Sequence, residues 1–212
     1  MSDPAKQGGL RVVKLGGSLL DWPEFPGQLR GWFARQSPWR NVLIAGGGDF
    51  ADVIRAADQT HALGQLVSHK LCIDSLHVTA KMVAWLLPEI RGPLPPGIME
   101  PSAEAQTTLL DVTALIELDA QRSVRPLPAI WDVTTDSIAA RAAVLLNADE
   151  LVLLKSTLPQ RASSLRSLAD AGYVDAHFPV CAKSLARIRL VNLRDADFAE
   201  IICSTGQSHR SP

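Results

Sequence analysis

Residues 10–15 read LRVVKL and residues 41–45 read NVLIA, and the fold class can be inferred outward from these two stretches. Both are short apolar runs rich in β-branched side chains, a composition typical of strands that are buried on both faces. A strand, a glycine turn and a helical pattern thus occur twice in succession. The glycines are Gly16 and Gly17 after the first run, and Gly46, Gly47 and Gly48 after the second.

The rest of the chain continues this alternation. Two more buried strands are expected at residues 150–154 and 188–191, whereas residues 108–118 fit a strand or a helix, and the proline-rich residues 92–101 predict a loop or a sheet edge. Short buried strands that alternate with helices indicate parallel pairing, right-handed crossovers and helices on both faces of one sheet. The sequence therefore predicts an open α/β fold. Its helices are expected at residues 25–36, 49–62, 65–87, 138–146, 163–171 and 197–202.

Length and charge limit the classes of protein to consider. The chain has 212 residues, of which 47% are hydrophobic, and this suits a single globular domain. We place that domain at residues 10–203, between a flexible N-terminus (residues 1–9) and a polar tail (residues 204–212). With 21 basic and 22 acidic residues the formal net charge is -1, so no general attraction to nucleic acid or to an anionic membrane is expected.

The cysteines and the N-terminus bear on the cellular compartment. Cys72, Cys181 and Cys203 lie far apart and show none of the paired spacings of a zinc site or a disulfide framework, which favours the reduced cytoplasm. Residues 1–9 lack the apolar stretch of a secretory signal, and no apolar run approaches the ~20 residues needed to cross a bilayer. We expect neither secretion nor membrane insertion.

Lys14 stands at the end of the first predicted strand, directly before the first glycine turn. Glycines let backbone N–H groups approach an anion, and a lysine adds a compact positive charge, so the combination favours phosphate binding. The glycines from Gly46 to Gly48 precede a predicted helix, whose N-terminus offers unpaired donors and roughly half a positive charge. A plain turn beside a solvated lysine is the alternative. Neither cluster fits G-x-G-x-x-G or G-x-x-x-x-G-K-[ST], which disfavours a Rossmann dehydrogenase and a Walker-type NTPase.

Residues 132–137 read DVTTDS and place two carboxylates, Asp132 and Asp136, where a predicted short strand at residues 129–131 gives way to a helix. An ordinary helix cap would account for Asp136, but it leaves Asp132 free to orient lysines or to approach a phosphate-bound metal. Lys155 follows the strand at residues 150–154. Because ligands of open α/β sheets bind beyond the carboxyl ends of the strands, the lysines at these ends are expected to converge.

Four motifs in a fixed order, VVKLGGS, IAGGG, DVTTDSIAA and LVLLK, resemble the amino acid kinase superfamily, which includes acetylglutamate, aspartate, carbamate, uridylate and isopentenyl phosphate kinases. The resemblance extends over residues 10–202, and the order of four motifs is far more specific than any one of them. It implies a three-layer αβα sandwich around an open, mainly parallel sheet of about eight strands. It also implies an ATP-dependent phosphotransferase that uses ATP and Mg²⁺.

The resemblance implies a role for each matching residue, without a metal site formed by the protein itself. Lys14 would contact the transferring phosphoryl group and Asp136 would hold the lysines in place. Lys183, the only lysine after Lys155, would assist at the β- and γ-phosphates. We assign Gly16, Gly17, Ser18, Asp132 and Lys155 to the nucleotide, and Gly46, Gly47 and Gly48 to the acceptor substrate.

One segment departs from the family pattern. Many members continue after Lys155 with D-x-D-G-[IV], whereas this chain reads Ser156-Thr157-Leu158, so the contacts to base and ribose are open. A non-catalytic ligand-binding or metal-oxide storage protein on the same fold is therefore an alternative. The length and the DVTTDSIA motif most resemble the small kinases of methanofuran biosynthesis, which phosphorylate a furan-methyl phosphate. Uridylate, isopentenyl phosphate and amino acid kinases are the alternative enzymes. The expected partners are a small-molecule acceptor and, as in many members, further copies of the chain.

Overall fold

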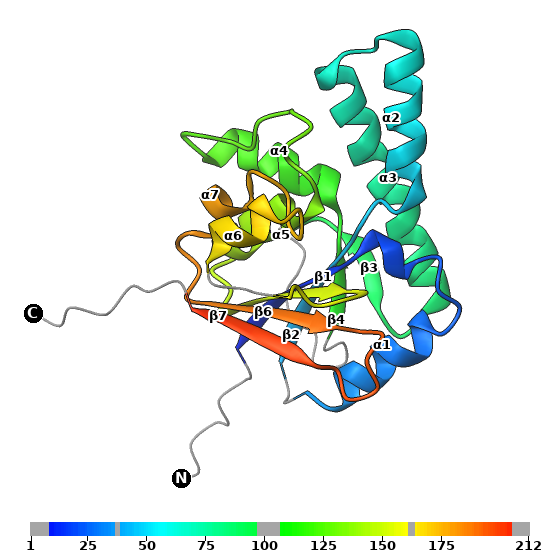
Figure 1. Ribbon diagram of the computed structural model, residues 1–212, viewed down its shortest axis with the longest axis vertical. Helices are drawn as coiled ribbons and strands as arrows, with labels where there is room; N and C mark the ends of the chain where they lie inside the picture. Colours follow the sequence, from blue (N-terminus) through cyan, green and yellow to red (C-terminus); the bar gives the residue numbers. More distant parts are fainter. Residues whose placement is uncertain (1–8, 37–38, 97–106, 161–163, 205–212) are drawn as a thin grey trace, which may run out of the picture.

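Figure 1 shows the computed structural model, which describes residues 9–36, 39–96, 107–160 and 164–204. The expected flexible N-terminus and polar tail lie outside these residues, except at residues 9 and 204. The strands of the described part form one sheet in the order β3-β4-β2-β1-β5-β6-β7. Their bounds are Leu10–Leu15 (β1), Arg40–Ala45 (β2), Arg91–Leu94 (β3), Thr107–Leu110 (β4), Glu150–Lys155 (β5), Arg187–Asn192 (β6) and Glu200–Ser204 (β7).

The sheet is parallel except for its last pair, β6 and β7. This confirms the predicted α/β class and the mainly parallel sheet, although the described residues contain seven strands rather than about eight. β1 lies between β2 and β5, so the chain builds the sheet outward from one side of β1 and later returns to its other side. Such a reversal is where open α/β sheets bind ligands, beyond the carboxyl ends of the strands.

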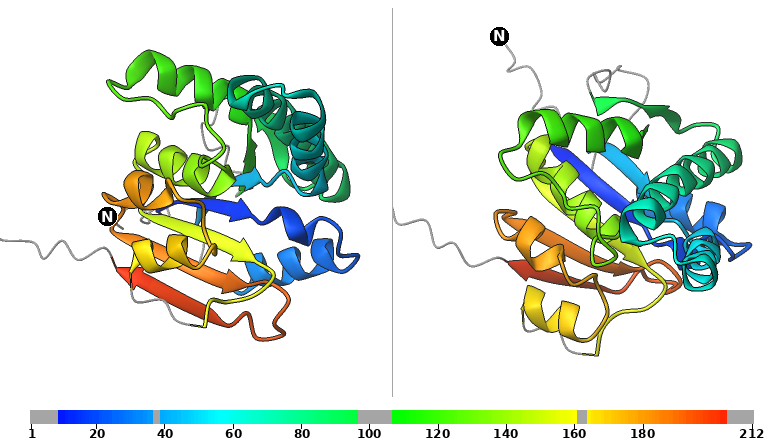
Figure 2. Two further views of the ribbon diagram at one scale, coloured as in Figure 1. Left: turned by 45° about the horizontal axis from the view of Figure 1, so that its top comes forward. Right: turned by 90° about the horizontal axis from the view of Figure 1, so that it is seen from above.

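Helices cover both faces of the sheet and complete the three-layer sandwich (Figure 2). Val12, Leu153 and their neighbours form the core under the first group of helices, and Leu15, Trp32 and Val83 belong to the core on the opposite face. The first group consists of α4 (Val112–Arg122), α5 (Thr135–Leu145), α6 (Leu165–Asp170) and α7 (Phe178–Ala182). The opposite face is covered by α1 (Phe25–Ala34) and by the C-terminal half of α3 (Gln65–Leu86).

α2 (Asp49–His61) and α3 form a helical hairpin that projects beyond the sheet (Figure 1). None of the residues of α2 is buried, whereas α3 contributes Ile73 and Leu76 to one core and Ala80 to the other. α3 therefore anchors the hairpin. Since α2 begins after the glycines that follow β2, the hairpin starts at the carboxyl end of a central strand.

Most predicted strands and helices are confirmed to within a few residues, but the last predicted helix is wrong. Residues 197–202 were expected to be a helix, and the chain instead turns at Phe198 and forms β7, antiparallel to β6. An ion pair between Arg189 and Glu200 supports this pairing. The apolar side chains at residues 201–203 fit either element, and only the neighbouring strand decides between them.

Three other segments differ from the expectation in detail. The ambiguous residues 108–118 contain both elements, because β4 ends at Leu110 and Asp111 caps α4 by accepting from the backbone N–H of Thr113 (3.0 Å). Residues 129–131 form turns rather than a strand. Of the predicted loop or sheet edge at residues 92–101, the first part belongs to the edge strand β3 and residues 97–101 lie outside the described residues. In the part of the chain that the structure covers, no helix combines the length and apolar character needed to cross a membrane.

Candidate active site

Two lysines converge on one buried carboxylate at the centre of the sheet. Lys14 lies in β1 and Lys155 ends the neighbouring strand β5, and the alternation of side chains directs both toward the face covered by α5. Asp136, in the first turn of α5, lies between them. Its Oδ1 is 2.9 Å from the ammonium of Lys14, and its Oδ2 accepts a hydrogen bond of 2.7 Å from Lys155.

The cluster is charged although it is almost free of solvent. Lys14 and Asp136 each expose 5% of their surface. Burial opposes ionisation of Asp136, but the neighbouring ammonium groups outweigh it and hold the pKa of Asp136 below its usual value. Burial and the charge of Lys14 lower the pKa of Lys155 to about 8, against the opposing effect of Asp136. Two cations and one anion leave an excess positive charge, which a phosphate could neutralise.

The two ammonium groups differ in how firmly they are held. Lys155 also donates to the carbonyl oxygen of Tyr173 (2.8 Å) and lies 5.2 Å from the centre of that ring. Lys14 bonds to the Oδ1 of Asp136 (2.9 Å) and to no second acceptor among the described residues. The N–H groups of Lys14 are therefore the more available for a ligand.

The two glycine turns lie against each other beside this cluster. The backbone N–H of Gly16 donates to Leu154 (2.8 Å), and that of Gly46 donates to Leu15 (2.9 Å), which fixes each turn to the adjacent strand. A Cβ atom on Gly17 would lie 2.3 Å from the backbone nitrogen of Gly48, so no side chain fits there. The N–H groups that follow, those of Gly17 and Gly47, meet no acceptor in the described part of the chain and can serve an anion.

DVTTDS is held in place by a residue whose role the sequence did not predict. Asp175 accepts hydrogen bonds from the backbone N–H groups of Thr134 (3.0 Å) and Ser137 (2.9 Å) and from both of their hydroxyl groups. Thr134 is the N-cap of α5, and its hydroxyl accepts from the N–H of Asp136 (3.4 Å). Asp175 is separated from these partners by 38 to 41 residues, so no local pattern could have revealed it.

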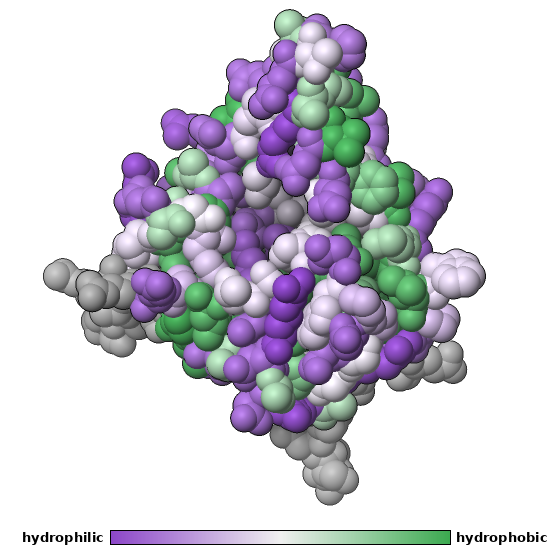
Figure 3. Space-filling view, turned by 45° about the vertical axis from the view of Figure 1, so that its right-hand side comes forward, coloured by the Kyte–Doolittle hydropathy of each residue, from purple (hydrophilic) through white to green (hydrophobic). Residues whose placement is uncertain are grey.

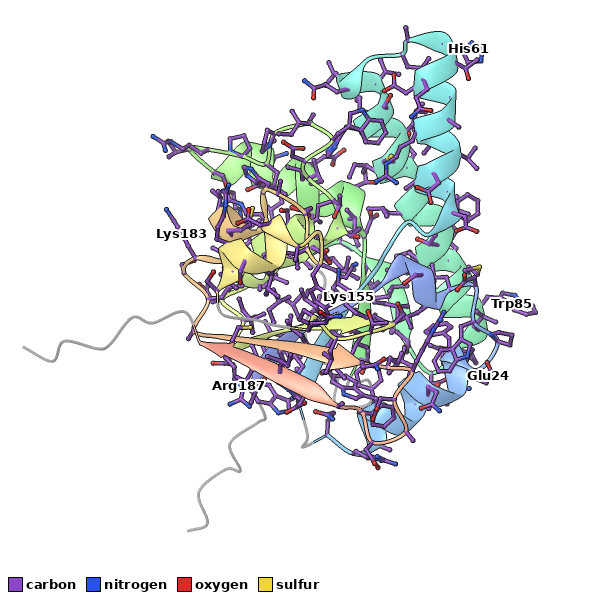
Figure 4. All side chains as sticks on the ribbon, viewed as in Figure 1. Glu24, His61, Trp85, Lys155, Lys183 and Arg187 are labelled. Atoms are coloured by element: carbon purple, nitrogen blue, oxygen red, sulfur yellow. The ribbon has the colours of Figure 1, made fainter. Side chains whose placement is uncertain are left out.

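The remaining predicted residues do not all join the cluster. Ser18 lies nearby, with its hydroxyl 3.3 Å from that of Ser156. Asp132 is exposed and forms no ion pair with either lysine among the described residues, where Asp136 holds both, so its assignment to the nucleotide stays a prediction. Lys183 is exposed at the end of α7 and points away from Lys155 (Figure 4). The structure therefore does not bring Lys183 to the predicted phosphate site.

A pocket opens between the hairpin and the first turn of α5, and Figure 3 shows the surface hollowed below the projecting hairpin. It reaches from the second glycine turn to the turn that contains Trp131. The lining is largely apolar and includes Gly47, Ala51, His69, Leu76, Trp131 and Thr135. One end of the pocket thus meets the glycine turn, where an acceptor substrate was expected.

A resident metal site is not evident beside the cluster. In the described ranges, no group of three or more His, Cys, Asp or Glu side chains is arranged to hold a metal ion. Both oxygens of Asp136 face lysine ammonium groups. Because Mg²⁺ commonly binds through substrate phosphates with only one or two carboxylates, these residues fit an ion that is carried by the phosphate oxygens of a nucleotide.

The open parallel sheet, the lysines at its carboxyl edge and the paired glycine turns form an arrangement that suits a phosphate ligand. No protein-family model matches the sequence. A [5-(aminomethyl)furan-3-yl]methyl phosphate kinase of Methanocaldococcus jannaschii is 26% identical over 154 residues, which cover 68% of this chain and 64% of that protein. The match therefore spans less than two thirds of the relative's length.

Solved structures share the fold at low sequence identity. The UMP kinase of Bacillus anthracis has a TM-score of 0.55 at 12% identity, with 93% of this chain and 100% of that chain covered. The UMP kinase of Ureaplasma parvum has a TM-score of 0.56 at 12% identity, with 93% and 99% covered. The likeness to this sequence relative and the fold shared with the two UMP kinases agree with the predicted resemblance of the four motifs to the amino acid kinase superfamily.

Proposed function

We propose that the chain is an ATP-dependent phosphotransferase that transfers the γ-phosphoryl group to a phosphate or carboxylate oxygen of a small molecule. The observation that carries this proposal is the convergence of Lys14 and Lys155 on the buried Asp136, directly beside two glycine turns with free N–H groups. Phosphoryl transfer needs mainly positioning and neutralisation of charge, and this arrangement provides both.

In the proposed reaction, an oxygen of the acceptor attacks the γ-phosphorus in line with the leaving group. The bond from that phosphorus to the β,γ-bridging oxygen breaks, its electron pair stays on ADP, and the acceptor keeps the phosphoryl group. Lys14 and the N–H groups of Gly17 and Gly47 neutralise charge on the oxygens of the phosphoryl group during its transfer. Lys155 would lie at the nucleotide side, and Asp136 would keep both lysines in place. Mg²⁺ would arrive bound to the phosphates of ATP and reduce their negative charge.

For the acceptor we propose a furan-methyl phosphate, with a role in methanofuran-type cofactor biosynthesis. The support is the resemblance of the DVTTDSIA motif and the kinase activity named for the relative from Methanocaldococcus jannaschii. The largely apolar pocket between the hairpin and α5 offers room for a small ring whose phosphate would face Gly47.

The test incubates the purified protein with MgATP and one acceptor at a time: a furan-methyl phosphate, UMP, isopentenyl phosphate, carbamate or an amino acid. We expect ADP and the furan-methyl diphosphate with the first acceptor. Release of ADP with an amino acid alone would refute the furan proposal, and release with UMP alone would replace it with a uridylate kinase.

The main alternative is a non-catalytic binding protein on this fold. This alternative stays open because the segment Ser156-Thr157 lacks the D-x-D-G pattern. Titration calorimetry with MgATP separates the two readings. A kinase should give heat of binding that is lost when Lys14 and Lys155 are both replaced by alanine. A protein without any heat on addition of MgATP would not be a kinase.

We also propose a cytoplasmic homo-oligomer. The three cysteines are free thiols, which fits a reducing compartment. On α3, Leu71, Val78 and Trp85 recur at seven-residue spacing with exposed side chains, and Trp85 points outward (Figure 4). This apolar stripe would suit a second copy of the chain. Sedimentation velocity should find a dimer or larger assembly that Trp85→Glu dissociates; a wild-type monomer would end this proposal.

A further inference from the structure

His69 is a buried polar side chain in the largely apolar lining of the pocket, whose other polar groups include Arg55. It lies in the first turns of α3 and exposes 8% of its surface. One face of α3 lines the pocket, with side chains at the three- and four-residue spacing of a helix: His69, Cys72, Ile73 and Leu76. The ring is thus presented to whatever molecule occupies the pocket.

The tautomer of His69 is fixed by its neighbour. Nδ1 lies 3.2 Å from the carbonyl oxygen of Ile130, and a carbonyl can only accept, so Nδ1 must carry the proton of this hydrogen bond. Burial lowers the pKa of His69, and this effect exceeds the opposite effect of the hydrogen bond to Ile130. The lowered pKa keeps the ring neutral at physiological pH. A neutral ring protonated at Nδ1 leaves Nε2 with a lone pair. Nε2 is therefore a hydrogen-bond acceptor.

Nε2 also has no partner of its own. Within the described part of the chain it makes no hydrogen bond, and it is not among the buried atoms that lack a partner, so it keeps some contact with the open pocket. The wall beside it is rigid, because the indole N–H of Trp131 donates to Asp58 (3.2 Å) and the guanidinium of Arg55 lies 5.5 Å from the Trp131 ring centre. A fixed acceptor in an apolar pocket selects for a donor on the ligand.

α3 sets the distance between this acceptor and the glycine turn. Gly47 lies against Ser75 and Leu76 of α3. His69 precedes Ser75 by six residues, which at about 1.5 Å per residue places it about 9 Å farther along the helix. A ligand that reaches both ends must therefore carry its phosphate and its donor group on opposite sides of a compact body.

We infer that His69 determines acceptor specificity: its Nε2 accepts a hydrogen bond from an N–H or O–H group that the acceptor carries at the end opposite to its reacting phosphate. This inference rests on the proposed function for the identity of the pocket as the acceptor site. The Nε2 of His69 would select one class of acceptor, a small phosphate ester with an amine or hydroxyl group at the end opposite to the phosphate.

The test compares two probes that differ only in the donor: [5-(aminomethyl)furan-3-yl]methyl phosphate and (5-methylfuran-3-yl)methyl phosphate. Wild-type protein should prefer the amine in kcat/KM by about 10- to 100-fold, the range for one hydrogen bond that involves a charged group. His69→Phe keeps a flat ring and removes both nitrogens, so its preference should fall to near onefold. His69→Gln restores an acceptor and should recover part of the preference. Lys70→Ala, at an exposed position of α3 next to His69 in the chain, should keep the wild-type ratio.

A preference that is equal in wild type and H69F, or a wild-type ratio near one, would overturn the inference. Because H69F leaves the Ile130 carbonyl with only its hydrogen bond from the N–H of Val133 (3.1 Å), its folding is checked by thermal denaturation, with His69→Leu as a second variant. Wild-type protein labelled with ¹⁵N-histidine gives a readout that needs neither variant nor turnover. The Nε2 resonance of His69 should move on binding of the amine probe and not of the methyl probe.

The nitrogen measurement also separates this inference from the proposed function. A shift of Nε2 without any ADP release would support the role of His69 and refute the kinase. ADP release with both probes at equal efficiency, without a shift of Nε2, would support the kinase and refute the role of His69. Absence of binding by either probe would overturn the inference.

Discussion

Gly17 and Gly48 lie back to back, and a Cβ atom added to Gly17 would stand 2.3 Å from the backbone nitrogen of Gly48. The two residues are in different turns, one after β1 and one after β2, and the first turn directly follows the strand that carries Lys14. Gly48 has a φ of 56°, a conformation that side chains disfavour, and it forms the N-cap of α2. The contact holds two backbone segments where they can share one phosphate chain.

Gly17→Ala should therefore force the turns apart. Since the clash is with backbone, we expect a loss of at least about 2 kcal/mol in the free energy of unfolding, as for overpacked sites. Gly27, in α1, is the matched control, because an added Cβ meets no atom within 4 Å there. Gly27→Ala should raise stability by about 0.5–1 kcal/mol. Urea unfolding measures both, and equal effects would contradict the close contact.

Lys14→Ala should reduce kcat about 10²- to 10³-fold while ATP binding weakens much less, because the freer ammonium acts mainly on the group in transfer. Lys183→Ala is the comparison. Its side chain is exposed and points away from the cluster, so its kcat should stay at the wild-type value. Steady-state kinetics and ATP titration measure these effects. Unchanged turnover in K14A, or a large loss in K183A, would reverse the two assignments.

Asp136→Asn should destabilise the protein by about 3 kcal/mol at pH 7, since it leaves two nearby ammonium groups without their counter-ion. The folded pKa of Asp136 is lowered, so its contribution is fully present above the unfolded value of ~3.9 and is lost as the pH falls through the lowered value. The stabilities of wild type and D136N should therefore converge only below about pH 4. Asp132→Asn, exposed in the same motif, should change stability by less than about 0.5 kcal/mol.

Lys155 should titrate with a pKa of about 8, well below an ordinary lysine. The chain has six lysines, so ¹³C-lysine labelling allows each ammonium group to be followed by NMR. Asp136 raises the pKa of Lys155, so D136N should lower it further. Because the folded pKa is depressed, ionised Lys155 reduces stability below pH 8, and this penalty is relieved as the pH rises from there toward the unfolded value. A midpoint above 10 would contradict the buried environment.

Asp175→Asn should weaken the start of α5 by about 2 kcal/mol, because a neutral amide accepts poorly and cannot replace a carboxylate that receives several N–H and O–H groups. Asp170→Asn provides a matched control, since Asp170 forms an exposed i,i+4 pair with Arg166. That change should alter stability by less than about 0.5 kcal/mol. D175N should also lower kcat through the displaced Asp136, and wild-type activity in D175N would argue against this positioning role.

Much of the fold follows from local patterns. The apolar runs of β1, β2 and β5 are continuous because both faces of these strands are buried, and glycines end the first two. Lys14 and Lys155 could be expected to meet, since parallel strands place the residues at their carboxyl ends along one edge of the sheet. Thr134 announces the start of α5 through ordinary capping chemistry.

What escaped prediction depends on contacts between distant residues. β7 is a strand because β6 offers it a free edge, and the local sequence does not report that edge. Asp175 acts on residues about forty positions earlier, and its own neighbours show no sign of this. Lys183 was assigned because it was the only lysine left downstream, a criterion that ignores the direction in which α7 carries it. His69 lies in an unremarkable stretch of α3, and only the carbonyl of Ile130 gives it a defined tautomer.

The hairpin of α2 and α3 carries one wall of the pocket, whereas the lysine cluster belongs to β1, β5 and α5. Under the proposed function, donor chemistry and acceptor choice would lie on separate parts of the chain, which meet at Gly47 and the start of α5. A few substitutions in the hairpin could then adapt the pocket to another substrate during evolution, while the lysine cluster stayed unchanged. Relatives with the same lysines and divergent hairpins would then be expected to phosphorylate different compounds.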